Sequence, residues 1–98
     1  MLDISDEDLK IVKEILQKYL PDCEVRAFGS RVKKTARKNS DLDLAVVGKE
    51  KLSLSLRTQL QEAFEESVLP FRVDVVDWNS ISDEFRRIIE GQYEVIQL

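Results

Sequence analysis

Asp41 and Asp43 are separated by one residue at the start of an apolar run, residues 42–47, that is typical of a β-strand. Residues two apart on a strand point to the same face, so both carboxylates can reach one point. Such a pair is unfavourable unless cations lie between the carboxylates. Two Mg²⁺ ions about 4 Å apart are an arrangement that two such carboxylates can bridge. The spacing therefore predicts a site for metal ions.

A third carboxylate is expected from the later apolar run at residues 71–76. Asp74 lies inside this run between two valines, where an acid is costly without a partner. Asp77 is the alternative, but it lies at the end of the run beside Trp78, where a solvated cap or turn role is sufficient. Strand alternation favours Asp74. An exposed acidic strand edge would explain Asp41, but it would not explain Asp74.

Gly29 and Ser30 lie between a predicted strand and a short predicted helix, where free backbone N–H groups and the helix dipole form an anion site. Glycine lets a phosphate approach closely, and the serine hydroxyl can donate to it. The basic residues that follow can neutralise a triphosphate or form a solvated helix face, and both interpretations stay open for Arg37 and Lys38. Arg31 is nearest the turn and is the preferred phosphate contact.

The composition excludes several kinds of site. The chain has no histidine and one cysteine, Cys23, so any metal must be bound by oxygen, which favours hard cations such as Mg²⁺, Mn²⁺ or Ca²⁺. The net charge of -4 argues against a binder of duplex DNA. The N-terminus is acidic, no apolar run is long enough to cross a bilayer, and the single cysteine agrees with a reducing compartment. We therefore expect a cytoplasmic protein without membrane contact.

The elements that position these residues follow from capping signals and apolar spacing. A capping-box signal at Ser5 and Asp8 opens an amphipathic helix that Pro21 ends. The other predicted elements are strands at 25–28, 42–47 and 71–76, a short helix after Ser30, a helix with an apolar stripe at Leu56, Leu60, Ala63, Phe64 and Val68, a helix that Ser82 opens and Gly91 caps, and an optional edge strand at 93–98. With 98 residues, 43% of them hydrophobic, the chain predicts a single α+β domain over residues 1–98.

The combination of Gly29-Ser30, a ten-residue spacer, Asp41-Leu42-Asp43 and Asp74 resembles the signature of the DNA polymerase beta superfamily of nucleotidyltransferases. The runs SDLDLAVV and VDVVDW extend the resemblance over most of the chain, and its short length narrows the resemblance to the minimal nucleotidyltransferase (MNT) group. Genes of that group commonly lie beside one for an all-helical HEPN protein. The resemblance implies a small mixed β-sheet backed by helices. Lys34 departs from the pattern, because members often have a turn glycine there.

The resemblance also implies roles for the candidate residues. Gly29 and Ser30 would hold the β and γ phosphates of ATP or another NTP. Asp41 and Asp43 would bind two Mg²⁺ ions, with Mn²⁺ as the alternative, and Asp74 would complete the site that activates an acceptor hydroxyl. The expected reaction transfers a nucleoside monophosphate, AMP from ATP, and releases pyrophosphate.

The acceptor is expected to be another polypeptide, because larger relatives carry an extra domain for it and this chain is too short for one. The resemblance points to a HEPN partner, and a homo-oligomer is left open. The alternative function is an antitoxin-type binding module that neutralises a HEPN ribonuclease by complex formation, with catalysis vestigial. Modification of a small molecule of the aminoglycoside kind is the third option.

Overall fold

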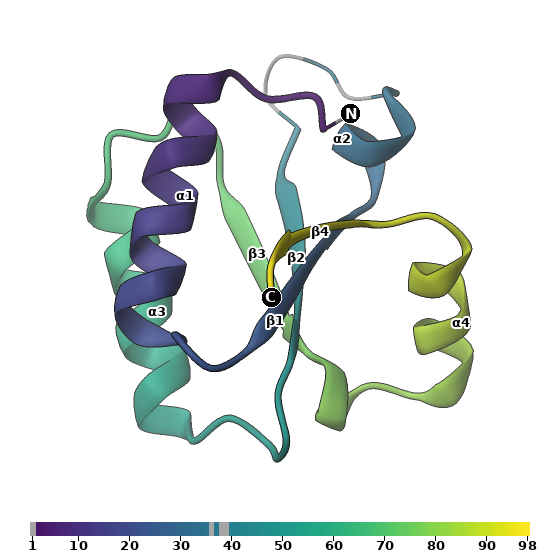
Figure 1. Ribbon diagram of the computed structural model, residues 1–98. Coiled ribbons are helices and arrows are strands. Elements are labelled where there is room, and N and C mark those ends of the chain that lie inside the picture. The colour runs from purple at the N-terminus through teal and green to yellow at the C-terminus, as the bar shows by residue number, and fades with distance from the viewer. Residues whose placement is uncertain (1, 36, 38–39) are drawn as a thin grey trace.

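A four-stranded sheet forms the centre of the computed structural model, which describes residues 2–35, 37 and 40–98. The strands are β1 (Glu24–Phe28), β2 (Leu42–Val47), β3 (Val73–Asp77) and β4 (Glu94–Gln97), in the order β3-β2-β1-β4. β2 and β3 are parallel, whereas β1 is antiparallel to both β2 and β4. Figure 1 shows helices α1 and α3 together on one face of the sheet and α4 on the other. The predicted α+β class and mixed sheet are confirmed.

Helix α1 (Asp6–Tyr19) begins where the capping signal predicted. The Ser5 hydroxyl oxygen accepts a hydrogen bond from the Asp8 N–H at 3.1 Å. Helix α3 (Leu54–Glu66) begins after Ser53, whose side chain caps it in the same way. The predicted apolar stripe extended to Val68, but the helix ends at Glu66 and the Val68 side chain is 84% exposed. That part of the prediction is wrong, because the backbone is already extended at Ser67, so the helix stops before Val68 although Val68 fits the spacing of the stripe.

The core lies between the sheet and the pair α1 and α3. Alternate residues of the two central strands are fully buried on this side: Val25, Ala27, Leu42, Leu44 and Val46. Since successive strand residues point to opposite faces, the intervening residues Phe28, Asp43 and Asp74 lie on the face that carries α4.

The C-terminal part of the chain covers a portion of that second face. A short 3₁₀ helix, η1 (Trp78–Ser80), follows β3, and helix α4 (Asp83–Gly91) begins after its predicted cap, Ser82. Phe85 of α4 meets Phe28 of β1 edge to face, with ring centroids 5.8 Å apart. The prediction that Gly91 caps α4 is wrong, because Gly91 is its last helical residue and the next residue provides the capping N–H.

The structure also decides two predictions about the strands β3 and β4. The optional last strand is present as β4, which pairs with β1 at the edge of the sheet. β3 begins at Val73, two residues later than predicted, and continues to Asp77.

Among the residues that the structure describes, no helix combines the length and the apolar character needed to cross a membrane.

Candidate active site

The Gly29-Ser30 turn joins β1 to a short helix, α2 (Ser30–Lys33). Gly29 has φ 79° and ψ -156°, a conformation that L side chains rarely adopt. The Gly29 carbonyl oxygen accepts hydrogen bonds from Val32 N–H and Lys33 N–H, both at 3.1 Å, which closes the turn. No side chain caps the start of α2. The turn therefore presents its first backbone N–H groups without a side-chain acceptor, as a phosphate site requires.

The carboxylate of Asp43 lies directly against this turn. Asp43 is opposite Phe28 in the antiparallel β1–β2 pair, so it is adjacent to the residue that follows Phe28 in the chain. A Cβ atom placed on Gly29 would be 2.3 Å from Oδ2 of Asp43, a distance that real Cβ atoms essentially never show, so the carboxylate would have to move. Gly29 is thus required twice, for its positive φ and for the space that Asp43 occupies. The sequence spacing predicted that both residues belong to one site, but it did not predict this close approach.

Asp74 is brought to the same place by the parallel pairing of β2 and β3, in which it is directly opposite Asp43. The Asp74 side chain is exposed, whereas that of Asp43 is half-buried. Burial raises the pKa of Asp43 to about 6, and the negative charges of Asp74 and then Asp41 contribute to this rise. The three aspartates predicted from the sequence therefore share one electrostatic environment.

The donor set fits a hard divalent cation, since it consists of carboxylate oxygens and backbone groups. Within residues 2–35, 37 and 40–98, no three acidic, cysteine or histidine side chains form a ready-made metal cluster. Like charges explain this, because carboxylates repel each other and the exposed side chains of Asp41 and Asp74 can turn toward water. The backbone positions bring these carboxylates together, and their final orientation depends on what neutralises them.

Asp77, the alternative to Asp74, lies on the opposite face of β3 and has a different role. It is 3% exposed, and its carboxylate accepts hydrogen bonds from Leu52 N–H (2.8 Å), Asn79 N–H (3.0 Å) and the Ser80 hydroxyl (3.3 Å). The predicted cap role is correct, but the cap is buried rather than solvated. Asp77 therefore connects the end of β3 to η1 and to Leu52, which lies just before α3.

The position of Arg31 differs from the predicted phosphate contact. Its side chain is 7% exposed and points into the protein, where the guanidinium donates to the carbonyl oxygens of Ser40 and Asp3. The guanidinium also lies over the ring of Phe71, 4.3 Å from its centroid. All three guanidinium nitrogens, Nε, Nη1 and Nη2, thus donate to backbone carbonyl oxygens, and the side chain is buried.

The other basic residues of the spacer behave as a solvated surface. The side chains of Lys33, Lys34 and Arg37 are exposed, and Lys38 lies outside the described residues. Lys34 caps the end of α2 with φ 59°, and it is the one non-glycine residue with positive φ in the described part of the chain. The glycine that the resemblance led us to expect there would adopt this conformation without strain.

One arrangement near the site had no signal in the sequence. The guanidinium of Arg26 stacks between Trp78 and Tyr93, at 4.9 and 4.6 Å from the ring centroids, and is paired with Glu24. Arg26 is two residues before Phe28 on the same face of β1. The stack therefore fixes η1 and the start of β4 on the side of the sheet that carries the aspartates. Trp78 and Tyr93 both pack against this guanidinium.

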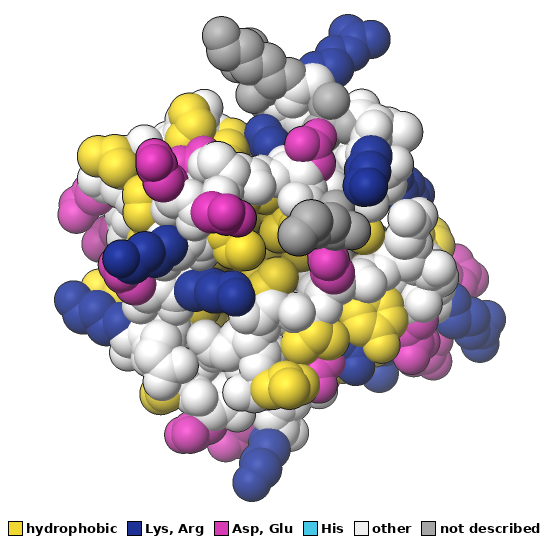
Figure 2. Space-filling view, turned by 45° about the horizontal axis from the view of Figure 1, so that its top comes forward, with side chains coloured by type: hydrophobic (Ala, Val, Ile, Leu, Met, Phe, Trp, Pro, Cys, Tyr) yellow, Lys and Arg dark blue, Asp and Glu magenta, His cyan; other side chains and the backbone are white. Residues whose placement is uncertain are grey.

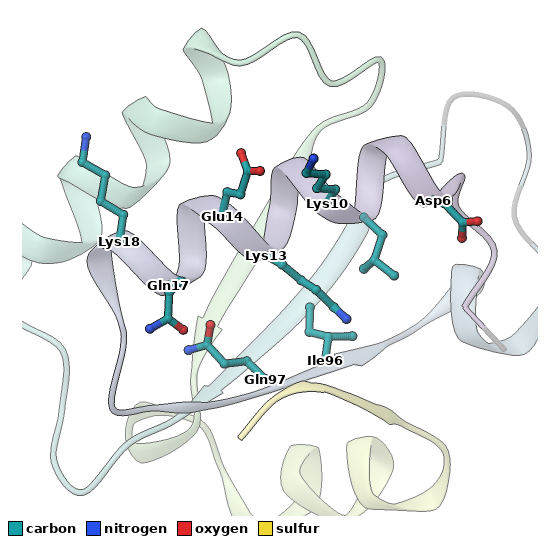
Figure 3. A pocket seen from close by; sticks show the side chains of 9 residues that line it. Asp6, Lys10, Lys13, Glu14, Gln17, Lys18, Ile96 and Gln97 are labelled. Carbon is teal, nitrogen blue, oxygen red and sulfur yellow. The ribbon is translucent and has the colours of Figure 1, made fainter.

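The surface carries charges of both signs (Figure 2). On the face turned to the viewer in Figure 2, acidic and basic side chains are interspersed, without the broad basic area that a duplex binder uses. A separate groove lies between α1 and β4, where Lys13 extends toward Ile96 in Figure 3. None of the three aspartates lines this groove.

Comparison with known proteins identifies a family and a close relative in sequence. The family model described as nucleotidyltransferase domain matches residues 9–96. A curated relative, the probable protein adenylyltransferase MntA of Haemophilus influenzae, is 56% identical over 96 residues, which are 98% of this chain and 84% of the relative.

Two solved structures are similar in fold. A crystal structure of a toxin-antitoxin with AMP-PNP is 27% identical, with a TM-score of 0.76, and the match covers 90% of this chain and 71% of that chain. The other is a structure of a tri-AMPylated Shewanella oneidensis HEPN toxin in complex with MNT antitoxin. The matched chain in that structure is 21% identical to this chain, with a TM-score of 0.72, and the match covers 95% of this chain and 71% of that chain. The second likeness shows a shared fold. The chain thus belongs to the nucleotidyltransferase domain family.

Proposed function

We propose that this protein is a Mg²⁺-dependent adenylyltransferase that transfers AMP from ATP to a hydroxyl group of a HEPN-family partner protein and releases pyrophosphate. The observation that carries the proposal is the contact of the Asp43 carboxylate with the Gly29 turn, opposite Asp74. The name of the Haemophilus influenzae relative, a probable protein adenylyltransferase, supports protein as the acceptor class.

The chain's own groups have complementary tasks in this reaction. Backbone N–H groups at the start of α2 and the Ser30 hydroxyl bind the phosphates. Asp41, Asp43 and Asp74 would hold Mg²⁺, which supplies charge neutralisation at the phosphates and a lower pKa of the acceptor hydroxyl.

Asp74 is exposed and therefore accessible to an acceptor. As the acceptor oxygen bonds to the α-phosphorus, the bond to the pyrophosphate oxygen breaks, and Asp74 accepts the hydroxyl proton. The half-buried Asp43 is suited to holding charge in place, because its position is fixed by β2 and by contact with Gly29. The two carboxylates differ in exposure, and this difference assigns their tasks.

A direct test is incubation of the protein with labelled ATP, Mg²⁺ and the proposed HEPN-family partner. Label is expected on the partner with the wild-type protein and not with Asp43→Asn. Asp22→Asn is the matched control, since it removes one exposed acid at the opposite end of β1 and is expected to label normally. Equal labelling by Asp43→Asn would refute the proposed site.

A second candidate function is an antitoxin that neutralises a HEPN ribonuclease by binding alone. It is favoured by one observation, that a similar solved structure is a toxin-antitoxin assembly. In this case the aspartates could be replaced without loss of protection.

A further inference from the structure

Arg31 and Asp77 are the charged side chains that are buried in the described part of the chain. Nε and Nη2 of Arg31 donate to the carbonyl oxygen of Ser40 at 3.0 and 2.6 Å, and Nη1 donates to the carbonyl oxygen of Asp3 at 2.9 Å. The Asp3 N–H donates in return to the Arg31 carbonyl oxygen at 2.8 Å. Figure 1 shows the N-terminal segment beside α2, in agreement with this pair of bonds.

These contacts connect the segments that enter the active site. Arg31 follows Ser30 of the phosphate turn, and Ser40 directly precedes Asp41. Phe71, over which the guanidinium lies, is three residues before Asp74. The Leu42 N–H donates to the Arg72 carbonyl oxygen at 2.9 Å, so the entrances of β2 and β3 are themselves joined. One side chain therefore touches the turn and the approach to each strand that supplies an aspartate.

The type of contact distinguishes this arginine from an ordinary buried ion pair. The partners that the structure gives it are two carbonyl oxygens and an aromatic ring, with no carboxylate among them. Burial of a cation is unfavourable, and an apolar side chain of similar volume often stabilises such a position equally well. What the guanidinium adds is direction, because its planar fork fixes two carbonyl groups at a set spacing.

We propose that Arg31 is a positioning residue for the nucleotidyl transfer proposed above, and in this sense the inference rests on that function. Its guanidinium holds the Ser40-Asp41 segment at a fixed separation from the Gly29-Ser30 turn. The phosphate-binding groups and the aspartates are thereby aligned before the nucleotide binds. Arg31 does not itself contact the nucleotide.

Arg31→Lys tests this, because lysine keeps the charge but cannot bond both carbonyl groups and stack on Phe71 at once. We expect Mg²⁺-AMP-PNP to bind about tenfold more weakly by calorimetry. We expect kcat for AMP transfer to fall about ten- to a hundredfold, because a displacement of about 1 Å can lower the rate about a hundredfold. Arg72→Lys is the matched control, since Arg72 is exposed. It is expected to behave as wild type.

A second control separates positioning from loss of stability. Val12 is fully buried on α1, which covers the other face of the sheet, so Val12→Ala lowers the melting temperature without touching the Arg31 contacts. Assayed well below its melting temperature, it is expected to keep wild-type kcat and nucleotide affinity. The inference fails if Val12→Ala loses as much of either as Arg31→Lys does.

Chemical rescue provides a readout that a purely structural role would not give. Arg31→Ala removes the guanidinium between two carbonyl groups and a ring, so guanidinium ion at tens of millimolar is expected to raise its kcat. Methylammonium is not expected to do so, and neither ion should raise the kcat of Val12→Ala. The inference is overturned if guanidinium does not raise the kcat of Arg31→Ala and if Arg31→Lys has wild-type kcat and nucleotide affinity. The proposed function is not affected by that outcome.

Failure of the proposed function has a different signature. If the wild-type protein labels no partner, that function is refuted, and the calorimetry decides the role of Arg31. Weaker nucleotide binding by Arg31→Lys than by Arg72→Lys then supports the inference. Equal binding, or no nucleotide binding by the wild-type protein, overturns it.

Discussion

The carboxyl group of Asp43 is half-buried beside Gly29 and opposite Asp74. Burial first, then the charges of Asp74 and Asp41, raise its pKa from 3.8 to about 6. The folded state therefore holds the Asp43 proton more tightly than the unfolded state does. Between these two pKa values, stability falls as pH rises, and the full penalty is present above pH 6.

Asp43→Asn is accordingly expected to stabilise the protein against urea at pH 7.5 without divalent ions, by about 1–2 kcal/mol after allowance for solvent screening. The gain should shrink as pH is lowered from 6 toward 4, because the wild-type carboxyl is then protonated in the folded state. Added Mg²⁺ should stabilise the wild type and not the variant. A gain of the same size at both ends of this pH range would contradict the assignment.

Gly29→Ala addresses the closest contact in the site. The added Cβ would meet Asp43 Oδ2 at 2.3 Å, and φ of 79° is strained for alanine. We expect a loss of about 1–3 kcal/mol in the free energy of unfolding, together with loss of AMP transfer.

Gly91→Ala is the matched control for that change. Gly91 is a helical residue with no atom within 4 Å of an added Cβ. This substitution is expected to be neutral or stabilising by up to about 1 kcal/mol, with transfer unchanged, by chemical denaturation and the labelling assay. If both glycine variants behaved alike, steric conflict with Asp43 would not be the cause.

At the level of elements, β3 carries two aspartates whose roles are separated by strand alternation. Asp74 is exposed opposite Asp43, whereas Asp77 is buried opposite Val46 and accepts three hydrogen bonds. One strand thus presents the proposed catalytic Asp74 on one face and a buried, hydrogen-bonded Asp77 on the other.

Alanine substitutions at the two positions should therefore have opposite effects. Asp77→Ala leaves buried N–H groups unsatisfied and is expected to lower the free energy of unfolding by about 2–3 kcal/mol, with transfer retained below its melting temperature. Asp74→Ala should change stability little and abolish transfer. Urea unfolding and the labelling assay on both variants check this. If only Asp77→Ala lost transfer, Asp77 and not Asp74 would be the aspartate that the reaction needs.

At the scale of the whole molecule, α1 and α3 cover one face of the sheet completely enough to bury its side chains, while α4 leaves Asp74 exposed on the other. A protein acceptor can reach the site from that open side. The two candidate functions, protein modification and neutralisation by binding, differ in their need for the aspartates.

A growth assay with the HEPN partner separates them. If modification is the function, Asp41→Ala/Asp43→Ala is expected to co-purify with the partner and yet fail to restore growth. Asp22→Asn provides the control at a remote position and should restore growth fully. Restored growth with the double variant would favour the binding module instead.

Much of this architecture follows from local patterns in the sequence. Capping by Ser5 and Ser82, the two-residue repeat of β2 and the end of the first helix before Pro21 involve neighbours within a few positions, so they are readable without a fold. The same repeat assigned Asp43 to a site face. The family signature depends on such short spacings too, which is why the α+β class and the enzyme family could be predicted.

The inward turn of Arg31 and the contact of Gly29 with Asp43 were decided by tertiary structure alone. The bonding partners of Arg31 are 9 and 28 positions away in the chain, and strand pairing brings Asp43 to Gly29. A sequence pattern specifies which side of its own element a residue occupies. It does not specify which distant backbone group arrives there, because that depends on how all the elements pack together.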